Sequence, residues 1–288
     1  MSATYEVTHT TRYRYEVGAT LCTNLAHLLP RDTPNQRVLA AEVTVDPEPD
    51  DRRQRHDLFG NEVLHFAVER PHDHLTVTAR SRIEAGRAPA PVDDGSPWEA
   101  ARDAAVDADG LLLRRATPFV PDLAVLADLA GPSFPPGASL LAAVTDLTRR
   151  LHDDFTYDPT ATSVSTPLLD VIEQRAGVCQ DFAHLALGCL RSVGLTARYV
   201  SGYLETFPPP GQPKLVGADA SHAWCAVRRA DGTWLDLDPT NAAVAPAHHL
   251  TVAWGRDYGD VVPLKGVVQA TRGATRLDVA VDVTRVDG

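Results

Sequence analysis

A cysteine, a histidine and an aspartate follow one another in the second half of the chain, each in a distinctive local setting. Cys179 stands in Gly-Val-Cys-Gln-Asp-Phe-Ala-His, His222 in Ser-His-Ala-Trp, and Asp238 in Asp-Pro-Thr-Asn. A thiol, an imidazole that takes its proton and a carboxylate that orients the imidazole make up a nucleophilic triad. These residue types in this order predict thiol chemistry, with Cys179 as nucleophile, His222 as base and Asp238 as the orienting group.

The residues after Cys179 have the spacing of an amphipathic helix. Apolar side chains recur at intervals of three and four from Phe182 to Val193, and Gly194 then suits a C-terminal cap. Cys179 would begin this helix, where unpaired N–H groups and the positive end of the dipole favour a thiolate. The same N–H groups could hold a developing oxyanion. A lone cysteine packed like alanine is the alternative, and the histidine and aspartate that follow argue against it.

The segment that carries His222 and Asp238 is predicted to be a β-hairpin with its turn at Gly232. A two-residue loop would put the two side chains on opposite faces, because side chains alternate along a strand. A three-residue loop with a left-handed Gly232 pairs Arg229 with Thr233 instead. That register makes His222 and Asp238 diagonal neighbours on one face, within side-chain reach. A working triad therefore requires the three-residue loop.

Three more side chains are candidates for lining the site. Gln180 follows the thiol directly. Asp181 lies in the first helical turn, where a carboxylate interacts favourably with the dipole, and a purely structural role is its alternative. Trp224 could shield the imidazole or line the acyl pocket, and plain core packing is its alternative.

Other titratable groups are assigned to structural or surface positions. Asp236 is the rival carboxylate on the same predicted face, but it lies further along the strand from the histidine. His184 lies on a different face of the helix from the thiol, and we expect it to be a structural or solvent-facing residue. His248 and His249 lie in an Ala/Pro-rich stretch and are expected at the surface. Five histidines in the N-terminal part have no obvious chemical partners: His27, His56, His65, His72 and His74.

The amino-acid composition and net charge indicate which kinds of binding partner are disfavoured. The chain has 288 residues, 44% of them hydrophobic and 23% charged, as is ordinary for a globular protein. Its net charge of −11 argues against nucleic acid or an anionic membrane as a partner. We see no apolar run of membrane-spanning length and no basic region followed by an apolar core at the N-terminus. A cytoplasmic location is therefore expected.

The four cysteines do not suggest a metal site. Cys22, Cys179, Cys189 and Cys225 include no Cys-x-x-Cys pair, and in a reducing compartment they should be free thiols. Zinc is therefore a poor interpretation. We expect neither a metal nor a cofactor.

Alternating apolar residues predict an antiparallel, sandwich-like β domain over residues 1–85. Its expected strands are 3–17, 37–46, 62–69 and 75–84. A charged turn is expected at 50–55. Residues 86–120 are expected to be a linker, beginning with a stretch rich in Pro, Gly and Asp.

Residues 121–288 are expected to form the catalytic core together with the C-terminal strands. The helices preceding the thiol are expected near 121–130, 138–152 and 167–175. The strands that follow the thiol helix are expected at 196–205, 221–229, 233–239 and 273–285. The run Pro208-Pro209-Pro210-Gly211 is expected to be an exposed loop that could border a cleft.

With these motifs assembled, the chain resembles the bacterial transglutaminase-like proteins, a family often described as cysteine proteases. Besides the cysteine motif, the matching segments are 198–203, 221–224, 234–241 and 257–263. The resemblance covers nearly the whole chain. It implies an α+β, papain-like fold in which the thiol helix packs on an antiparallel sheet, preceded by the β domain. We see no acidic loop suited to calcium, so the calcium dependence of animal transglutaminases is not implied.

The resemblance implies acyl transfer from a peptide or isopeptide amide through a thioacyl-enzyme at Cys179. Water as acceptor gives a protease or peptidase, and an amine gives a transglutaminase or amide ligase, because the pocket chooses the acceptor. We expect hydrolysis, since water is always present and nothing in the sequence identifies an amine site. Two alternatives are a non-catalytic scaffold that binds a partner protein and a thiol acetyltransferase, which coenzyme A binding would reveal.

Overall fold

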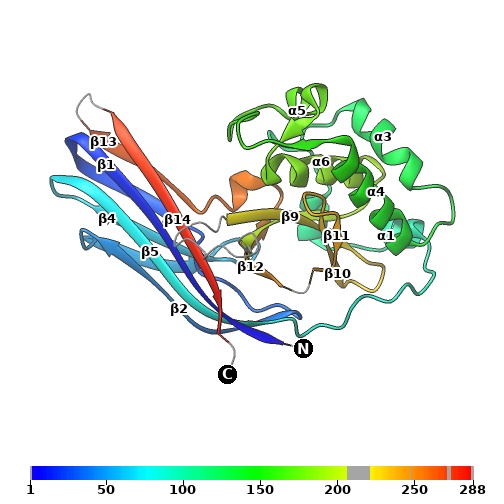
Figure 1. Ribbon diagram of the computed structural model, residues 1–288, viewed down its shortest axis with the longest axis horizontal. Helices are drawn as coiled ribbons and strands as arrows, with labels where there is room; N and C mark the ends of the chain where they lie inside the picture. Colours follow the sequence, from blue (N-terminus) through cyan, green and yellow to red (C-terminus); the bar gives the residue numbers. More distant parts are fainter. Residues whose placement is uncertain (1, 206–220, 247, 271–273, 287–288) are drawn as a thin grey trace, which may run out of the picture.

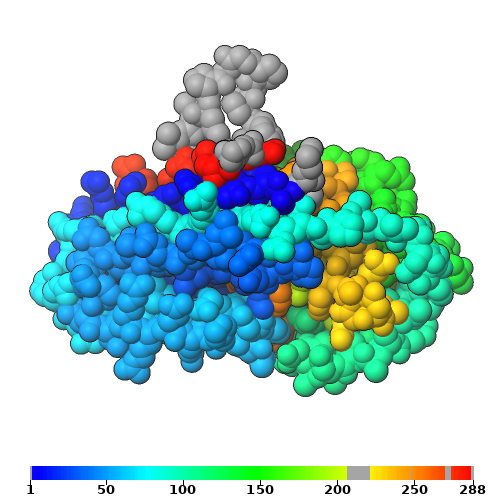
Figure 2. Space-filling view, turned by 90° about the horizontal axis from the view of Figure 1, so that it is seen from below, coloured from blue at the N-terminus to red at the C-terminus, as the bar shows by residue number. Residues whose placement is uncertain are grey.

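The computed structural model describes residues 2–205, 221–246, 248–270 and 274–286. The predicted loop at 208–211 lies outside these residues. Figure 1 shows a long, curled antiparallel sheet beside a second region of helices packed on a smaller sheet. Figure 2 shows the blue strands of the first region directly against the green and yellow second region. In the described part of the chain, no helix is long and apolar enough to cross a membrane.

The N-terminal sheet is built around one 24-residue strand, β1. Its strands are β1 (Ala3–Ala26), β2 (Gln36–Asp46), β3 (Asp51–His56), β4 (Glu62–Val68), β5 (His72–Ala85), β13 (Leu264–Ala270) and β14 (Thr275–Arg285). The first half of β1 pairs with β5 and β14, and its second half with β4 and β13. β2 and β3 extend the sheet beyond β5 and β4. The sheet curls so that Val43, Phe66 and Val77 meet in one apolar core.

Two sequence expectations for this region are wrong. Residues 275–285 do form a strand, but β14, like β13, belongs to the N-terminal sheet and not to the second, helical region. The reason is that β1 is long enough to need partners along both of its edges, and the chain returns to supply them. Residues 51–56 form strand β3 instead of a charged turn. All six of its side chains are exposed, so no apolar alternation marks it.

The linker prediction is also incomplete. Residues 98–113 contain two short helices, α1 (Trp98–Asp103) and α2 (Ala108–Leu113). Trp98 and Leu113 are buried, so this stretch contributes to the folded core. Helices of six residues carry too few apolar positions to show a periodic signal.

The second region has the predicted α+β class. Its longer helices are α3 (Ala124–Ala130), α4 (Leu140–Asp154), α5 (Leu168–Gln174) and α6 (Cys179–Ser192). Its sheet has the order β11 (Ala243–Val244), β10 (Trp234–Asp238), β9 (Ser221–Arg228), β8 (Ala197–Leu204) and β12 (His249–Gly255). The four predicted helices are thus confirmed within a few residues. α6 packs on β9 and β8, and its residues from Gln180 to Leu190 are buried.

The edge strand β12 is joined to the N-terminal region by two buried amides. The Gln36 side chain donates to the Thr251 carbonyl at 2.7 Å and accepts from the Thr251 N–H at 2.8 Å. Asn61 makes the same pair of bonds to Trp254, at 2.8 and 3.0 Å. The two side chains therefore continue the hydrogen-bond ladder at an edge that would otherwise be open.

Candidate active site

Cys179 is the first residue of α6, and the turn before it fixes its position. The Val178 N–H donates to Asp181 Oδ2 at 2.8 Å, and Thr162 Oγ1 donates to the same oxygen at 2.6 Å. A Cβ on Gly177 would lie 2.6 Å from that oxygen, so glycine is required here. Burial raises the pKa of Asp181, and these two hydrogen bonds oppose the rise. Asp181 therefore fixes the turn that leads into α6. This is the structural role that the sequence suggested as its alternative.

The start of α6 presents two backbone donors next to the thiol. Within the described residues, no acceptor binds the N–H groups of Cys179 and Gln180, as is usual for the first turn of a helix. The Gln180 side chain donates to the Val164 carbonyl at 3.1 Å, which holds the preceding loop against the helix. The two N–H groups are placed to receive a developing oxyanion.

The hairpin has the predicted three-residue loop. Arg229 donates its N–H to the Thr233 carbonyl at 2.8 Å, and Gly232 is left-handed with φ +85°. Trp234 pairs with Arg228, and the register continues toward Leu237. This register decides which side chains share a face of the hairpin, because side chains alternate between the two faces along each strand, starting at the turn.

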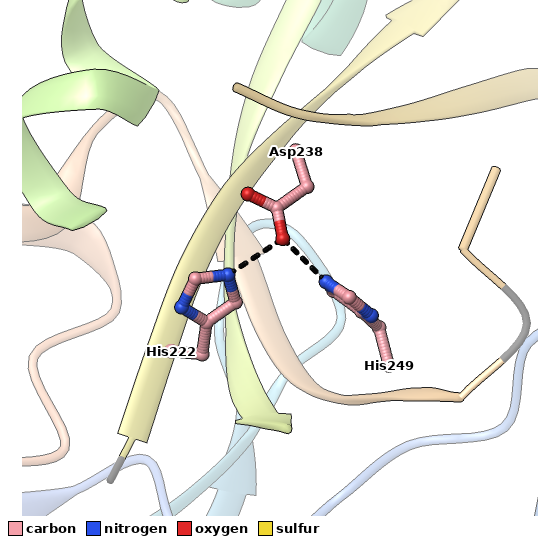
Figure 3. A group of neighbouring side chains, drawn as sticks. All are labelled: His222, Asp238 and His249. Atoms are coloured by element: carbon pink, nitrogen blue, oxygen red, sulfur yellow. Dashed lines mark hydrogen bonds and ion pairs between the residues drawn. The ribbon is translucent and has the colours of Figure 1, made fainter. Parts of the chain in front are cut away.

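His222 and Asp238 form a direct hydrogen bond, shown in Figure 3. Nε2 of His222 lies 2.8 Å from Oδ2 of Asp238. Burial opposes protonation of His222, but its hydrogen bonds to Asp238 and to Cys179 outweigh burial and raise its pKa to about 9. Because Nε2 faces Asp238, Nδ1 is the ring nitrogen left for the thiol. The structure therefore brings the three predicted residues together.

The Asp238 carboxylate is fully buried and surrounded by donors. Asn241 Nδ2 donates to Oδ2 at 2.7 Å, and the N–H groups of Thr240 and Asn241 donate to Oδ1 at 3.0 and 3.2 Å. Burial favours the neutral acid, but hydrogen bonds from His222 and His249 prevail and hold the pKa of Asp238 well below its usual range. The group is therefore a fixed anion. Asn241 was not singled out from the sequence, although it closes the Asp-Pro-Thr-Asn motif.

His249 is the main site residue that sequence reasoning missed. The expectation that it lies at the surface is wrong: it is 6% exposed, and its Nε2 lies 2.7 Å from Asp238 Oδ2. Both imidazoles therefore meet the same carboxylate oxygen (Figure 3). The sequence signal was weak, because His249 begins the short strand β12, which was not predicted. Its neighbour His248 is exposed, as expected.

Tyr157 is a second residue near the thiol that the sequence did not identify. It lies in β6 (Thr156–Tyr157), which runs parallel to β7 (Ala176–Gly177) just before Cys179. Burial and the charge of Cys179 raise the pKa of Tyr157, and its side chain is 54% exposed. This tyrosine thus lies near enough to the thiol to feel its charge, and its side chain is largely in solvent. Only the non-local β6–β7 pairing brings it there.

The other candidates occupy supporting positions. Trp224 is fully buried, with its ring 6.1 Å from that of His222 and 5.0 Å from that of His249, so it packs beneath both imidazoles. Burial raises the pKa of the rival carboxylate, Asp236, and the positive charge of Arg198 opposes the rise. Asp236 therefore feels the charge of Arg198, and its side chain makes no hydrogen bond or ion pair with His222 in the described part of the chain.

His184 is a buried structural residue, one of the two roles expected for it. Its Nε2 accepts the Tyr258 N–H at 3.1 Å, and its ring stacks on Phe119. Burial and, to a lesser extent, the charge of Arg191 lower its pKa to about 3. The ring is therefore neutral at physiological pH and serves as a buried acceptor.

The polar atoms of His222, Asp238 and His249 lie within 4.8 Å of one another, which is close enough for them to share a metal ion. The two N···O distances of 2.8 and 2.7 Å are those of direct hydrogen bonds. Zinc bonds of about 2.0–2.2 Å would need both nitrogens deprotonated and turned from the carboxylate toward the ion. The observed geometry is that of two imidazoles hydrogen-bonded to one carboxylate oxygen.

Comparisons with known proteins cover the whole chain. Residues 5–84 match the family model described as bacterial transglutaminase-like N-terminal region, and residues 133–239 match the model of the transglutaminase-like superfamily. The Mycobacterium tuberculosis protein Rv2569c is 41% identical over 99% of this chain and 93% of its own length. The Mycobacterium leprae protein ML0607 is 37% identical over 97% of this chain and 98% of its own.

A solved structure shares the fold. It is titled "The Crystal Structure of a Putative Cysteine Protease from Cytophaga hutchinsonii" and superposes with a TM-score of 0.76. The match covers 100% of this chain and 92% of that one, at 17% identity. At that identity the likeness concerns the fold, and it extends over both the N-terminal sheet and the helical region.

Proposed function

The chain belongs to the transglutaminase-like superfamily, and on that premise we propose that it is an enzyme that cleaves a peptide or isopeptide amide through a thioacyl intermediate on Cys179. The observation that carries the proposal is the 2.8 Å hydrogen bond between His222 and Asp238 beside Cys179, the first residue of α6. A buried imidazole with a pKa raised to about 9 is the counter-ion that a reactive thiolate needs at neutral pH.

The proposed reaction begins with transfer of the thiol proton to His222 Nδ1. The Cys179 sulfur then attacks the amide carbon, and the carbonyl oxygen becomes an oxyanion near the N–H groups of Cys179 and Gln180. Collapse of this intermediate breaks the C–N bond, and His222 gives its proton to the departing amine. The acyl group remains on sulfur as a thioester, and Asp238 stabilises the imidazolium throughout.

The second half of the reaction decides between hydrolysis and transfer. His222 takes a proton from the acceptor, which attacks the thioester and releases the Cys179 thiolate. We propose water as the acceptor, which yields a carboxylic acid. An amine would yield a new amide by the same steps. The name of the similar Cytophaga structure supports testing hydrolysis first.

The first test is the rate of iodoacetamide labelling of each cysteine between pH 5 and 9, in wild type and in His222→Ala. We expect Cys179 alone to react fast below pH 8, and this reactivity to disappear in His222→Ala. Cys22, Cys189 and Cys225 are buried and serve as internal controls. Slow, ordinary labelling of Cys179 in the wild type would contradict the proposal and favour a non-catalytic scaffold.

The acceptor is tested with glutamine-containing peptides, with and without a fluorescent primary amine. Release of the acid or of a shorter peptide without amine incorporation supports hydrolysis. Incorporation of the amine supports transferase activity instead. Either product must be absent in Cys179→Ala.

A further inference from the structure

We propose that His249 is a positioning residue of the acyl-transfer site, which holds the Asp238 carboxylate in place for His222 by donating to the same oxygen. The inference rests on the proposed function, since it assigns a role within that site. It extends the three-residue arrangement predicted from the sequence to a fourth side chain, supplied by the edge strand β12.

The first observation is the geometry at Asp238 Oδ2. His249 Nε2 lies 2.7 Å from this oxygen and His222 Nε2 lies 2.8 Å from it, from another direction (Figure 3). The carboxylate is 0% exposed and His249 is 6% exposed. With so little access for water, the contact is a direct bond in a setting where losing a partner is costly.

The second observation defines which nitrogen of His249 carries the proton. Among the described residues, the buried Nδ1 has no hydrogen-bond partner. A proton on Nδ1 would be a buried donor without an acceptor, which costs about 1–3 kcal/mol. The proton of a neutral ring therefore belongs on Nε2, where the carboxylate accepts it. His249 is thus a fixed donor to Asp238.

The third observation is that the ring of His249 is held by packing. Trp224 meets it edge to face, with the ring centroids 5.0 Å apart and the planes at 85°. Trp224 in turn needs the space left by Gly202, because a Cβ there would lie 2.6 Å from the indole and 2.1 Å from the Leu250 carbonyl. Gly202 in β8 therefore leaves room for Trp224, which packs against the imidazole of His249.

The N-terminal region supports the same segment. The Tyr5 hydroxyl and His248 Nδ1 are hydrogen-bonded at 3.0 Å, and Tyr5 is buried in β1. β12 is also fixed by the amides of Gln36 and Asn61. The N-terminal sheet thereby positions the strand that carries His249, which gives this sheet a part in the geometry of the site.

The consequence for the chemistry follows from the role of Asp238. Its hydrogen bond raises the pKa of His222 against the effect of burial. Without the donor from His249, the carboxylate can turn toward its remaining donors on Asn241 and Thr240 and spend less time facing His222. Fewer thiolate–imidazolium pairs would then form. The other carboxylate near His249 is Asp236; burial raises its pKa, and Arg198 and, to a lesser extent, His249 oppose the rise. His249→Ala and His249→Gln remove this influence on Asp236 alike, so the difference between the two variants reports the donor to Asp238.

The test measures the pH profile of Cys179 alkylation in wild type, His249→Ala and His249→Gln. The amide nitrogen of glutamine can occupy the place of Nε2 and donate to Asp238. We expect labelling at pH 6 to be about tenfold slower in His249→Ala, the effect of a change of about one pKa unit, and within about threefold of wild type in His249→Gln. His27→Ala, a buried histidine of the N-terminal region, controls for general loss of stability.

The outcomes separate the two proposals. Fast wild-type labelling that is lost in His222→Ala but unchanged in His249→Ala overturns the role of His249 and leaves the proposed function intact. Slow wild-type labelling overturns the proposed function itself. A glutamine variant as impaired as the alanine variant also contradicts the donor role.

A second measurement needs no variant that might misfold. Long-range 1H–15N correlation spectra of the wild-type protein report which nitrogen of each histidine ring carries a proton. We expect His249 to carry it on Nε2 and not on Nδ1. A proton on Nδ1 alone would exclude donation to Asp238 and overturn the inference.

Discussion

Asp238 shows at the scale of single residues how a short motif builds a site. Among the described residues it accepts five hydrogen bonds, from His222, His249, Asn241 twice and Thr240. Three of these come from the two residues that follow Pro239 in the Asp-Pro-Thr-Asn motif, so the motif holds its own carboxylate. The remaining two come from imidazoles on other strands. This explains how a fully buried carboxylate stays ionised.

The His222–Asp238 pair should make stability depend on pH. The pKa of His222 is about 9 in the folded protein and about 6.5 as an ordinary histidine. Its protonated form therefore stabilises the fold fully below about pH 6.5, and this contribution, roughly 3 kcal/mol, is lost as the pH rises through about 9. Asp238→Asn removes the carboxylate that raises this pKa. We expect the difference in unfolding free energy between wild type and Asp238→Asn to be largest near pH 6 and to shrink toward pH 10.

Urea denaturation at several pH values measures this difference. The control is Asp231→Asn, since Asp231 is an exposed carboxylate in the hairpin turn, away from the imidazole. A difference that stays constant from pH 6 to 10 would show that His222 does not hold an extra proton in the folded state.

At the scale of elements, the start of α6 and the β9–β10 hairpin position Cys179, His222 and Asp238. The helix begins at Cys179 because the side chain of Asp181 turns back to bind the Val178 N–H. The hairpin register follows from one left-handed glycine, Gly232. Both devices are local, and both were predicted from a few neighbouring residues.

Gly177→Ala should disturb the first of these devices. Its new Cβ would lie 2.6 Å from Asp181 Oδ2, so the carboxylate has to move and the Val178 N–H loses its acceptor. We expect a loss of about 1–3 kcal/mol in unfolding free energy and slower labelling of Cys179. Gly131→Ala is the matched control, because a Cβ there meets no atom within 4 Å and its φ of −46° suits alanine. Equal stability of the two variants would refute this account of the turn.

At the scale of the whole molecule, an apolar cluster and several hydrogen bonds join the two regions. Tyr5, Val7 and Val283 of the N-terminal sheet pack in the same apolar cluster as α6 and β9. The amides of Gln36 and Asn61 complete the ladder of β12. The regions are therefore expected to unfold together.

Gln36→Ala tests this connection. The substitution leaves the N–H and carbonyl of Thr251 without their present partners in a buried setting, so we expect a loss of about 2 kcal/mol or more. Thermal unfolding should remain a single transition at a lower temperature. The control is Gln54→Ala, an exposed glutamine of β3 that should have little effect. Two separate unfolding transitions, or no change in the unfolding temperature of Gln36→Ala, would show that the hydrogen bonds between Gln36 and Thr251 do not couple the two regions.

Local patterns were sufficient to predict much of this protein. The 3.6-residue period predicted α6 and its first residue, and the three-residue turn at Gly232 predicted His222 and Asp238 as diagonal neighbours on one face. These features depend on residues close together in the chain, whose geometry follows from backbone sterics and side-chain alternation. The α+β class and the transglutaminase-like family could be inferred from the same motifs.

Only the tertiary structure decided which distant segments meet. β13 and β14 are recognisable at most as strands, but their pairing with β1 joins residues that lie between 238 positions (Ala26 and Leu264) and 280 positions (Tyr5 and Arg285) apart. His249 lies in a short strand without a clear period, and it reaches Asp238 only because β12 folds back along β8. Such contacts depend on the packing of the whole chain, because the hydrophobic effect that drives them has no direction and leaves no local pattern.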